Sequence, residues 1–310
     1  MSTPKNDDTP ELLQFPSTTG AAPSRPTSPS IDFSVGDDAG PELDLMNSSK
    51  APNDPAPPRI VSTLDLTGKK KVICWVGRGK TGKTTGIRWL AETAMANGTP
   101  LLMADLDVTN DTFSRYIKGV ARPPEASDPA LSLKWLDKLL QHTLQQQSSL
   151  LVDLGGGDTT LRRLVTQLPD LTKLFEAQGF VVVLFHTVGP QEEDLSPLAT
   201  LQTLGFRPTA TAIVLNEAMI DVGETRDSAF ARLYRHSVFR RAVDEGAVPV
   251  FMPRLFAAQQ VEVRRLKFRD AIDGRTGRGD APLGPFDRAR VKIWLEAMDA
   301  NFESIKSWLP

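Results

Sequence analysis

Hydrophobic residues recur along the chain in short apolar runs, and segments with helical spacing separate these runs. Buried strands are expected at 72–76, 101–105, 149–153, 180–185, 210–216 and 248–252. Helices are expected at 84–96, 131–147, 194–204, 227–245, 257–269 and 286–308. Strands that alternate with helices pair in parallel through right-handed crossovers. The pattern therefore predicts an α/β fold, with a mostly parallel β-sheet covered by helices on both faces.

The first 60 residues lack this pattern. They contain eleven of the 24 prolines, and their four basic and nine acidic residues give a net charge of about −5. Such a segment buries too little apolar surface to offset the entropy of ordering. We interpret 1–60 as a disordered Pro/Ser/Asp-rich tail and 61–310 as the folded domain. Two apolar islands, 12–15 and 31–33, could be docking motifs, although a plain linker is the simpler interpretation.

Composition narrows the class of protein. The only cysteine, Cys74, excludes a disulfide framework and suits a reducing compartment. The net charge of −2 gives no overall basicity that would point to nucleic acid. No apolar run is long enough to span a membrane, and the polar N-terminus is unlike a secretory signal. We therefore expect a cytoplasmic protein.

The most informative motif is Gly77-x4-Gly82-Lys83-Thr84, between a predicted strand and a predicted helix. It satisfies the phosphate-loop template G-x-x-x-x-G-K-[ST]. The glycines allow successive N–H groups to point inward, and the helix N-terminus adds partial positive charge. Lys83 would reach the β- and γ-phosphates, and the Thr84 hydroxyl would bind Mg²⁺. A chance match in a glycine-rich turn is the alternative, but the flanking elements agree with a nucleoside triphosphate site.

Carboxylates follow the next two predicted strands. Asp105 and Asp107 come at the end of 101–105, and Asp153 ends 149–153, before three glycines. Ligands of open α/β sheets bind at these strand ends, which favours a catalytic role for the carboxylates. An aspartate at a strand end can also be a helix cap, and Asp158 fits that description. Asp153 could hold Mg²⁺ through a water molecule.

These stretches, together with Val214-Leu-Asn216 and Pro253-Arg254, resemble the ParA/MinD group of deviant Walker ATPases in the SIMIBI class, over about 70–305. The resemblance implies a P-loop ATPase domain at 61–310, with ATP and Mg²⁺ as cofactors. It implies that Asp107 positions the attacking water and that Thr84, Asp107 and Asp153 serve the metal. It also implies that Asn216 and the backbone after Pro253 hold adenine. The expected nucleotide contacts are Gly77, Gly79, Lys80, Thr81, Gly82, Lys83, Thr84, Thr85, Asn216, Pro253 and Arg254.

One position departs from the family pattern. The family's signature lysine, five residues before Lys83, is replaced by Arg78, and Lys80 replaces the second glycine of the loop. In the family this lysine reaches phosphate, typically across an ATP-sandwich homodimer. An arginine fork also suits phosphate oxygens, so Lys83, Asp107 and Arg78 are the expected catalytic residues. Whether Arg78 acts within its own chain or across a dimer stays open.

The partners of such a switch are less defined. Residues 226–270 hold ten basic against five acidic residues. If they share a face, they could bind DNA phosphates without sequence preference, as the family's partition members do; solvated helix faces are an equal alternative. The residues in question are Arg232, Arg235, Arg240, Arg241, Arg264, Arg265, Lys267 and Arg269. The terminal helix has an acidic polar face, which favours packing onto the sheet or a protein partner over a membrane.

We therefore expect an ATP-dependent positioning or partition ATPase that acts as a nucleotide-switched dimer in plasmid or DNA segregation or in conjugative transfer. An adaptor or cargo protein would be its partner. Two alternatives stay open. One is a metabolic P-loop enzyme of the dethiobiotin-synthetase type, which phosphorylates a small molecule. The other is a scaffold that binds nucleotide without hydrolysing it.

Overall fold

The structure is a computed structural model that describes residues 62–107, 112–123, 129–155, 159–279 and 281–310. The predicted tail at 1–60 and the predicted cap Asp158 lie outside the described residues, so both stay predictions.

A parallel sheet forms the centre of the described chain. Its strands are β1 (Lys70–Gly77), β2 (Leu101–Asp105), β3 (Ser149–Asp153), β4 (Phe180–Val188), β5 (Ala210–Asn216) and β6 (Val248–Met252). Their order is β2-β3-β1-β4-β5-β6, and every pair is parallel. Each predicted strand is confirmed, and β4 continues three residues beyond the predicted end. All six carboxyl ends therefore meet at one edge of the sheet.

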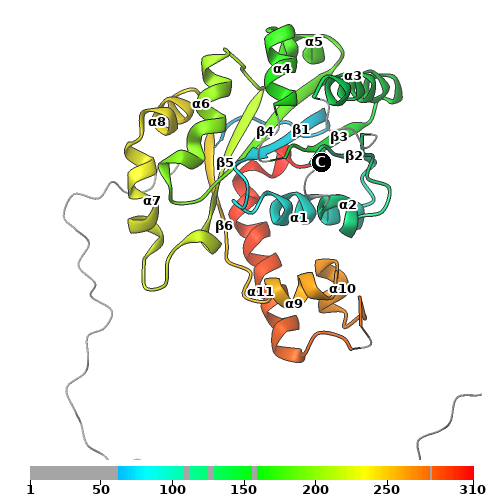
Figure 1. The fold of residues 1–310 in the computed structure, drawn as a ribbon, viewed down its shortest axis with the longest axis vertical. Coiled ribbons are helices and arrows are strands. Elements are labelled where there is room, and N and C mark those ends of the chain that lie inside the picture. Colours follow the sequence, from blue (N-terminus) through cyan, green and yellow to red (C-terminus); the bar gives the residue numbers. More distant parts are fainter. Residues whose placement is uncertain (1–61, 108–111, 124–128, 156–158, 280) are drawn as a thin grey trace, which may run out of the picture. The chain divides into compact units, whose positions relative to one another are not determined.

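Helices cover both faces of this sheet (Figure 1). They are α1 (Lys83–Ala96), α2 (Thr112–Tyr116), α3 (Pro129–Gln146), α4 (Thr160–Gln167), α5 (Leu171–Ala177), α6 (Ser196–Thr203), α7 (Arg226–Arg235), α8 (Ser237–Asp244), α9 (Ala258–Val263), α10 (Phe268–Ile272) and α11 (Pro285–Phe302). Short 3₁₀ turns lie at η1 (Glu192–Leu195), η2 (Glu217–Met219) and η3 (Glu303–Trp308). The predicted α/β class, with helices on both faces, is confirmed.

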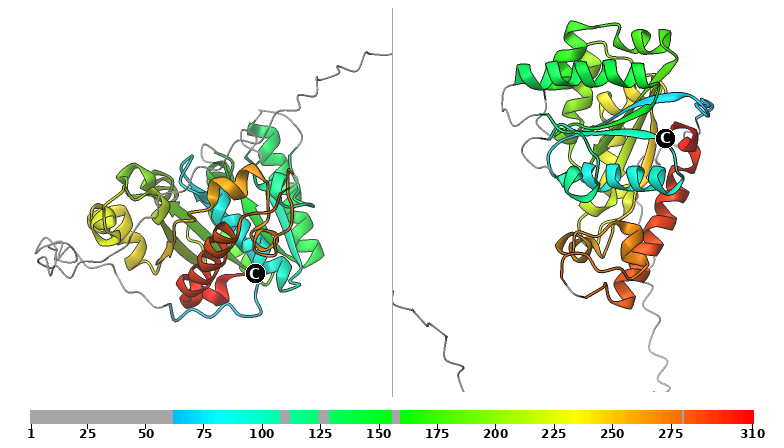
Figure 2. Two further views of the ribbon diagram at one scale, coloured as in Figure 1. Left: turned by 90° about the horizontal axis from the view of Figure 1, so that it is seen from below. Right: turned by 90° about the vertical axis from the view of Figure 1, so that its right-hand side faces the viewer.

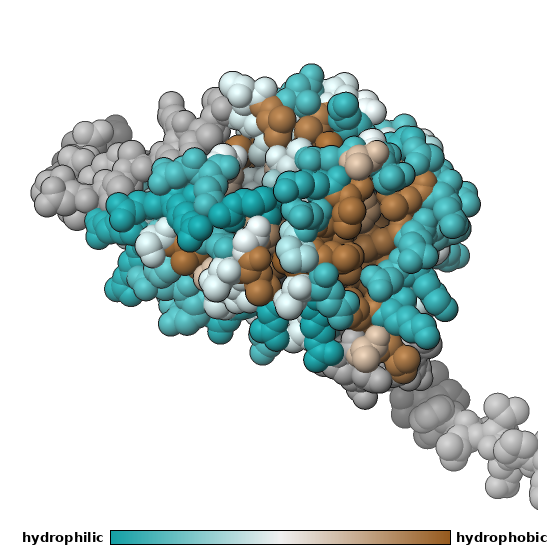
Figure 3. All heavy atoms as spheres, turned by 90° about the horizontal axis from the view of Figure 1, so that it is seen from above, coloured by the Kyte–Doolittle hydropathy of each residue, from teal (hydrophilic) through white to brown (hydrophobic). Residues whose placement is uncertain are grey.

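Successive side chains of a strand point to opposite faces of the sheet, so the hydrophobic core consists of separate clusters on the two faces. In β1, Ile73 and Trp75 face a cluster shared with α1, α10 and α11, whereas Val72 and Cys74 face α3, α4 and α5. A third cluster joins the β5 side of the sheet to α7 and α8. On the face that carries α3, α4 and α5, apolar residues also reach the surface (Figure 3), with Leu131, Leu168 and Leu174 partly exposed.

Two predicted helices were wrong as single elements. The helix at 227–245 breaks at His236, which has extended φ/ψ of −67° and 134° and accepts a hydrogen bond from Val238 N at Nδ1 (3.2 Å). The helix at 257–269 ends at Val263, Arg265 takes a φ of +50°, and a separate helix begins at Phe268. In both places hydrophobic spacing continues across the break, so periodicity alone did not show it.

The C-terminal segment packs on the sheet. Trp294, Met298 and Phe302 of α11 are buried in the core, and the chain then turns into η3, where Trp308 Nε1 donates to Leu64 O (3.0 Å). The other end of α11 carries α9 and α10, which lie away from the sheet in Figure 1 and in the right-hand view of Figure 2. We call residues 258–279, which include α9 and α10, the basic hook. No helix among the described residues is long and apolar enough to cross a membrane.

Candidate nucleotide site

The phosphate loop lies where the motif predicted, between β1 and α1. Gly82 has a φ of +95°, and a Cβ there would lie 2.4 Å from Asn216 Nδ2, so a side chain would be strained as well as crowded. The Thr81 hydroxyl donates to Arg78 O (2.8 Å), and Lys83 Nζ lies 3.4 Å from the same carbonyl. The loop therefore closes on itself with the Lys83 side chain folded inward.

The structure brings Lys83, Asp107 and Asp153 together. Strands β2 and β3 pair Asp105 with Asp153, and a Cβ on Gly155 would lie 3.0 Å from Asp107 Cγ. Burial lowers the pKa of Lys83, and the carboxylates of Asp153 and Asp107 act in the opposite direction. The three charged groups thus lie close enough beside the loop to interact electrostatically.

Asp105 has a structural role. Its Oδ1 accepts from Asp107 N (3.1 Å), and its Oδ2 accepts from Ser114 N (3.1 Å). Burial raises the pKa of Asp105 against the effect of these bonds. This carboxylate ties the backbone at the end of β2, as far as Asp107, to α2.

The predicted adenine contacts lie beside the loop. Asn216 is buried, and its Nδ2 donates to Thr81 O (2.8 Å) while its Oδ1 accepts from Ala218 N (3.0 Å). Its amide therefore braces the loop in this structure, a role that the sequence did not indicate. Pro253 O accepts from Trp294 Nε1 (2.8 Å), and the Arg254 guanidinium donates to the carbonyls of Glu217 and Ile220. Contact of these residues with a base stays a prediction.

Arg78 forms an ion pair within its own chain. Its Nη1 lies 3.0 Å from Asp194 Oδ1, and Gly189 N donates to Asp194 Oδ2 (2.9 Å). The Asp194 side chain is only 4% exposed, whereas that of Arg78 is 46% exposed. Lys80 is exposed and has a φ of +68°. Asp194 is a site residue that the sequence analysis missed, and no motif marks it.

The predicted metal ligands have the right chemistry for Mg²⁺, which prefers oxygen donors. Thr84 offers a hydroxyl on the first turn of α1, and Asp107 and Asp153 offer carboxylates at the strand ends. Asp153 is 2% exposed, and it faces the Lys83 ammonium. The residues therefore fit a magnesium ion shared with nucleotide phosphates.

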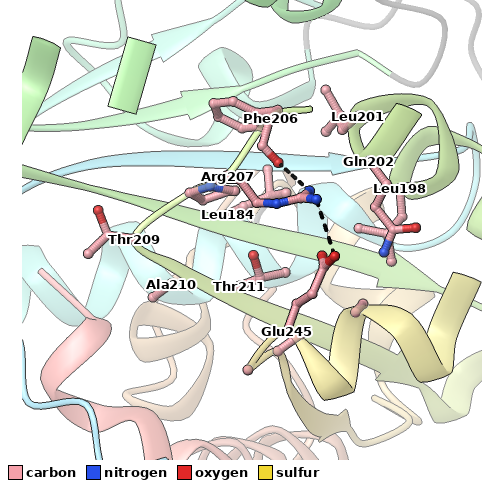
Figure 4. A pocket seen from close by; sticks show the side chains of 14 residues that line it. Leu184, Leu198, Leu201, Gln202, Phe206, Arg207, Thr209, Ala210, Thr211 and Glu245 are labelled. Carbon is pink, nitrogen blue, oxygen red and sulfur yellow. Dashed lines mark hydrogen bonds and ion pairs between the residues drawn. The ribbon is translucent and has the colours of Figure 1, made fainter. Parts of the chain in front are cut away.

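Two hollows of the described chain lie outside the phosphate loop. A pocket of about 70 Å³ lies where β5 begins, lined by Leu198, Thr209 and Thr211 and bounded by an ion pair between Arg207 and Glu245 (3.2 Å; Figure 4). Because all strands are parallel, it lies at the edge opposite the phosphate loop, and it is too small for a nucleotide. An open groove of about 870 Å³, lined in part by Pro253 and Arg254, adjoins the predicted base site.

The eight basic residues predicted to bind DNA fall into two groups. Arg232, Arg235, Arg240 and Arg241 lie on α7 and α8, and Arg264, Arg265, Lys267 and Arg269 lie on the basic hook. In Figures 1 and 2 these elements occupy separate parts of the domain, so the eight residues form two surfaces and not the single face that the prediction required.

No protein-family model matches the chain, nor does any curated protein. Among solved structures, the signal recognition particle receptor FtsY of Elizabethkingia anophelis in complex with GDP is 16% identical, over 61% of this chain and 58% of its own, with a TM-score of 0.39. FtsY of Thermotoga maritima is 13% identical over 76% and 72%, with a TM-score of 0.40. The MinD cell division protein of Aquifex aeolicus is 14% identical over 74% and 97%, with a TM-score of 0.40. This chain spans only 58% of the length of the first FtsY chain.

Proposed function

We propose that this chain is a nucleotide-switched P-loop ATPase that uses ATP and Mg²⁺ and acts on DNA, in segregation or conjugative transfer. The observation that carries the proposal is the convergence of Lys83, Asp107 and Asp153 beside the closed loop at 77–83. Phosphoryl transfer needs little covalent help from a protein, so positioning and charge stabilisation are sufficient catalysis.

Each residue has a role that follows from its place. The loop amides and Lys83 bind the phosphates, and the Lys83 ammonium stabilises charge on the γ-phosphoryl oxygens. Asp107 orients the attacking water, because it lies at the strand end that faces Lys83. Thr84 and Asp153 would hold Mg²⁺, which neutralises charge between the β- and γ-phosphates when bound.

Arg78 is proposed to be the residue that responds to dimerisation. Its guanidinium is half-exposed at the loop and is held by a single carboxylate, Asp194. Because the Arg78 side of the pair is open to water, its charge is partly screened, and phosphate oxygens can compete with Asp194 for the guanidinium. We infer that Arg78 leaves Asp194 for phosphate when two ATP-bound subunits meet, as the family resemblance implies for the signature position.

The basic hook is the better candidate for DNA. Two of the hook's acidic residues, Asp270 and Asp273, form ion pairs with Arg275. The rest of the hook has five basic residues and one acidic residue, Glu262. Those five are Arg264, Arg265, Lys267, Arg269 and Arg278, and none of them forms an ion pair with a described carboxylate. On α7 and α8, by contrast, Arg241 pairs with Glu245 and Arg226 with Glu217.

Backbone contacts within the hook also hold its basic residues close to one another. Arg278 N donates to Arg264 O (2.7 Å), and a Cβ on Gly277 would lie 2.0 Å from that oxygen, so only glycine fits. Arg265 is held at a φ of +50°, which costs a non-glycine residue about 1 kcal/mol. Two arginine-bearing segments are thus fixed side by side, in an arrangement suited to successive phosphates.

Nucleotide binding is tested by calorimetry with ATP and with GTP. Wild-type protein should bind ATP with Mg²⁺, and Lys83→Ala should lose it; micromolar ATP affinity in Lys83→Ala would refute the loop assignment. Turnover stimulated by DNA supports the proposal. Phosphate transfer only to a small acceptor would favour a metabolic kinase, and no turnover under any condition would favour a nucleotide-binding scaffold.

DNA binding is tested with a random-sequence duplex. Arg265→Glu with Arg278→Glu should weaken binding at least tenfold and lower the salt dependence of the affinity, because each lost phosphate contact removes about one counterion from the slope. Arg240→Glu with Arg241→Glu is the matched control on α8 and should have a smaller effect. A larger effect in the control pair would move the DNA surface to α7 and α8.

A further inference from the structure

The outer face of α1 contacts the basic hook through Arg88. Its side chain is buried (3% exposed), and Nη2 donates to Leu266 O at 2.8 Å. The guanidinium carbon lies 3.4 Å from the ring centre of Tyr116 on α2 and 4.5 Å from that of Phe268 on α10. Arg88 is therefore held between α2 and α10, the second helix of the hook.

Glu92 lies one turn further along α1 and contacts the same helix of the hook. Its Oε2 accepts from Phe268 N (2.7 Å) and from Arg269 N (3.4 Å), so the carboxylate caps α10 from another element. The Glu92 side chain is also buried. The basic residues at 264–269 are thus positioned by two side chains of the helix that starts at the phosphate loop.

This contact leaves two buried polar atoms without a hydrogen-bond partner among the described residues, Arg88 Nε and Glu92 Oε1. Buried polar atoms are nearly always satisfied, so a pair of exceptions at one contact requires an explanation. The two residues are four apart on α1, and side chains at this spacing face each other on a helix. An ion pair between the two side chains would satisfy both unpaired atoms, which are not the atoms that bind the hook in this structure.

We propose that Arg88 and Glu92 form a two-position latch that couples the phosphate site to the basic hook. In the docked position, seen in this structure, Arg88 binds Leu266 O and Glu92 caps α10. In the released position Arg88 and Glu92 pair with each other, which frees the amides of Phe268 and Arg269. The latch rests on the proposed function, because it regulates the DNA surface of the same switch.

Tyr116 connects the latch to the phosphate site. It lies on α2, and α2 is tied to the end of β2 by Asp105, which binds both Asp107 N and Ser114 N. A shift of Asp107 toward a γ-phosphate is thereby transmitted to α2. Withdrawal of the Tyr116 ring removes one of the two faces that hold the Arg88 guanidinium against the hook, and the released position becomes favourable.

Hydrogen exchange of the full-length chain, measured by mass spectrometry with and without ATP and Mg²⁺, tests the latch. In the wild type, ATP should speed exchange of the 268–272 amides roughly tenfold, because the Glu92 cap is lost. Binding of ATP is measured on the same samples by calorimetry. Unchanged exchange in protein that binds ATP overturns the latch alone, and failure to bind ATP overturns both the latch and the proposed function.

Two variants should move the latch in opposite directions. Glu92→Gln can still cap α10 but cannot form an ion pair with Arg88, so exchange should stay slow with and without ATP. Tyr116→Leu removes the stacked ring, so exchange should be fast in both conditions while ATP affinity is kept. Glu296→Gln, an exposed change on α11, is the matched control and should respond as the wild type does. A wild-type response to ATP in both latch variants would overturn the proposal.

Discussion

At the residue scale, the phosphate loop is held by side chains that lie far away in the sequence. Asn216 donates to Thr81 O across a separation of 135 residues, and Asp194 binds Arg78 across 116. Both polar partners are buried, where a hydrogen bond to a backbone or charged group stabilises more than it does at the surface. The loop therefore depends on the ends of β4 and β5 as well as on its own glycines.

Replacement of Asn216 by alanine should weaken ATP binding. The variant loses the bond to Thr81 O and leaves a gap against Gly82, so we expect a loss of about 1–3 kcal/mol in unfolding free energy and a weaker nucleotide affinity by calorimetry. Asn301→Ala is the matched control, since Asn301 Nδ2 donates to Phe251 O (2.9 Å) away from the loop. It should lose stability without losing ATP affinity. Equal ATP affinity in the Asn216 variant and the wild type would contradict the prediction.

A double-mutant cycle on Arg78 and Asp194 tests the ion pair. Because the arginine is half-exposed, we expect a coupling energy of only about 0.5–1 kcal/mol in urea unfolding. Asp194→Asn alone should cost more than this coupling, because Gly189 N loses a charged acceptor in a buried position. A coupling energy of several kcal/mol would show that phosphate cannot compete for Arg78.

The sequence identified the loop and its facing carboxylates because a short motif and strand ends are local signals. Lys83 was predicted from the phosphate-loop template, and Asp107 and Asp153 were predicted from the ends of β-strand patterns. Asp194 and the bracing role of Asn216 needed the strand order, which places β4 beside β1 and β5 beyond it. No spacing along the chain contains that information.

At the element scale, helix breaks depend on single side-chain contacts that hydrophobic periodicity does not record. The helix expected at 227–245 is divided because His236 caps α8 with its ring nitrogen. Within the basic hook, α10 is separate from α9 because Glu92, 176 residues before Phe268, supplies the cap of α10. Local propensity favoured continuous helices, but a local cap at His236 and a tertiary contact from Glu92 divide them.

The cap at His236 can be measured directly. His236→Ala removes the acceptor for Val238 N and should lower the unfolding free energy by about 1 kcal/mol in urea titrations. His236→Ser should restore most of that loss, because serine is a favourable N-cap residue. If alanine is tolerated as well as serine, the break has another cause.

Glu92 should make stability depend on pH. Burial raises the pKa of its carboxyl to about 7 from 4.5, and nearby Arg88, Lys267 and the amides of α10 only partly offset that rise. Below pH 4.5 the Glu92 carboxyl is protonated in both the folded and the unfolded chain, so it does not lower the unfolding free energy. As the pH rises toward 7, the unfolded chain loses the proton first, so the unfolding free energy falls, by about 3 kcal/mol in all.

The unfolding free energies of the wild type and Glu92→Gln are compared by urea unfolding at pH 5 and pH 8. The wild type should lose stability relative to Glu92→Gln between these two values, because glutamine cannot ionise. Glu296→Gln should follow the wild type at both values. Parallel behaviour of wild type and Glu92→Gln would mean that the carboxyl titrates outside this window.

At the scale of the whole molecule, the parallel sheet brings all the chemistry to one edge. Every strand end that carries a predicted site residue belongs to that edge, from Asp107 after β2 to Pro253 after β6. The class of fold followed from strands alternating with helices, whereas the strand order and the separation of the two basic surfaces did not. The described chain therefore has one sheet edge that carries the proposed nucleotide site and, beyond α1, a distinct charged hook.

Trapping the ATP state should reveal the dimer. Asp107→Ala keeps Lys83 and the loop amides, so it should bind ATP but turn it over more slowly by at least about a hundredfold. Size-exclusion chromatography with light scattering should then show the mass of a dimer with ATP and Mg²⁺ and the mass of a monomer with ADP.

Adding Arg78→Ala should return the mass to that of the monomer, because the guanidinium group at the loop is lost. Lys83→Ala, which binds no nucleotide, should stay monomeric throughout. A monomeric Asp107→Ala protein that holds ATP would separate nucleotide binding from dimerisation and leave Arg78 as a residue that acts only within its own chain.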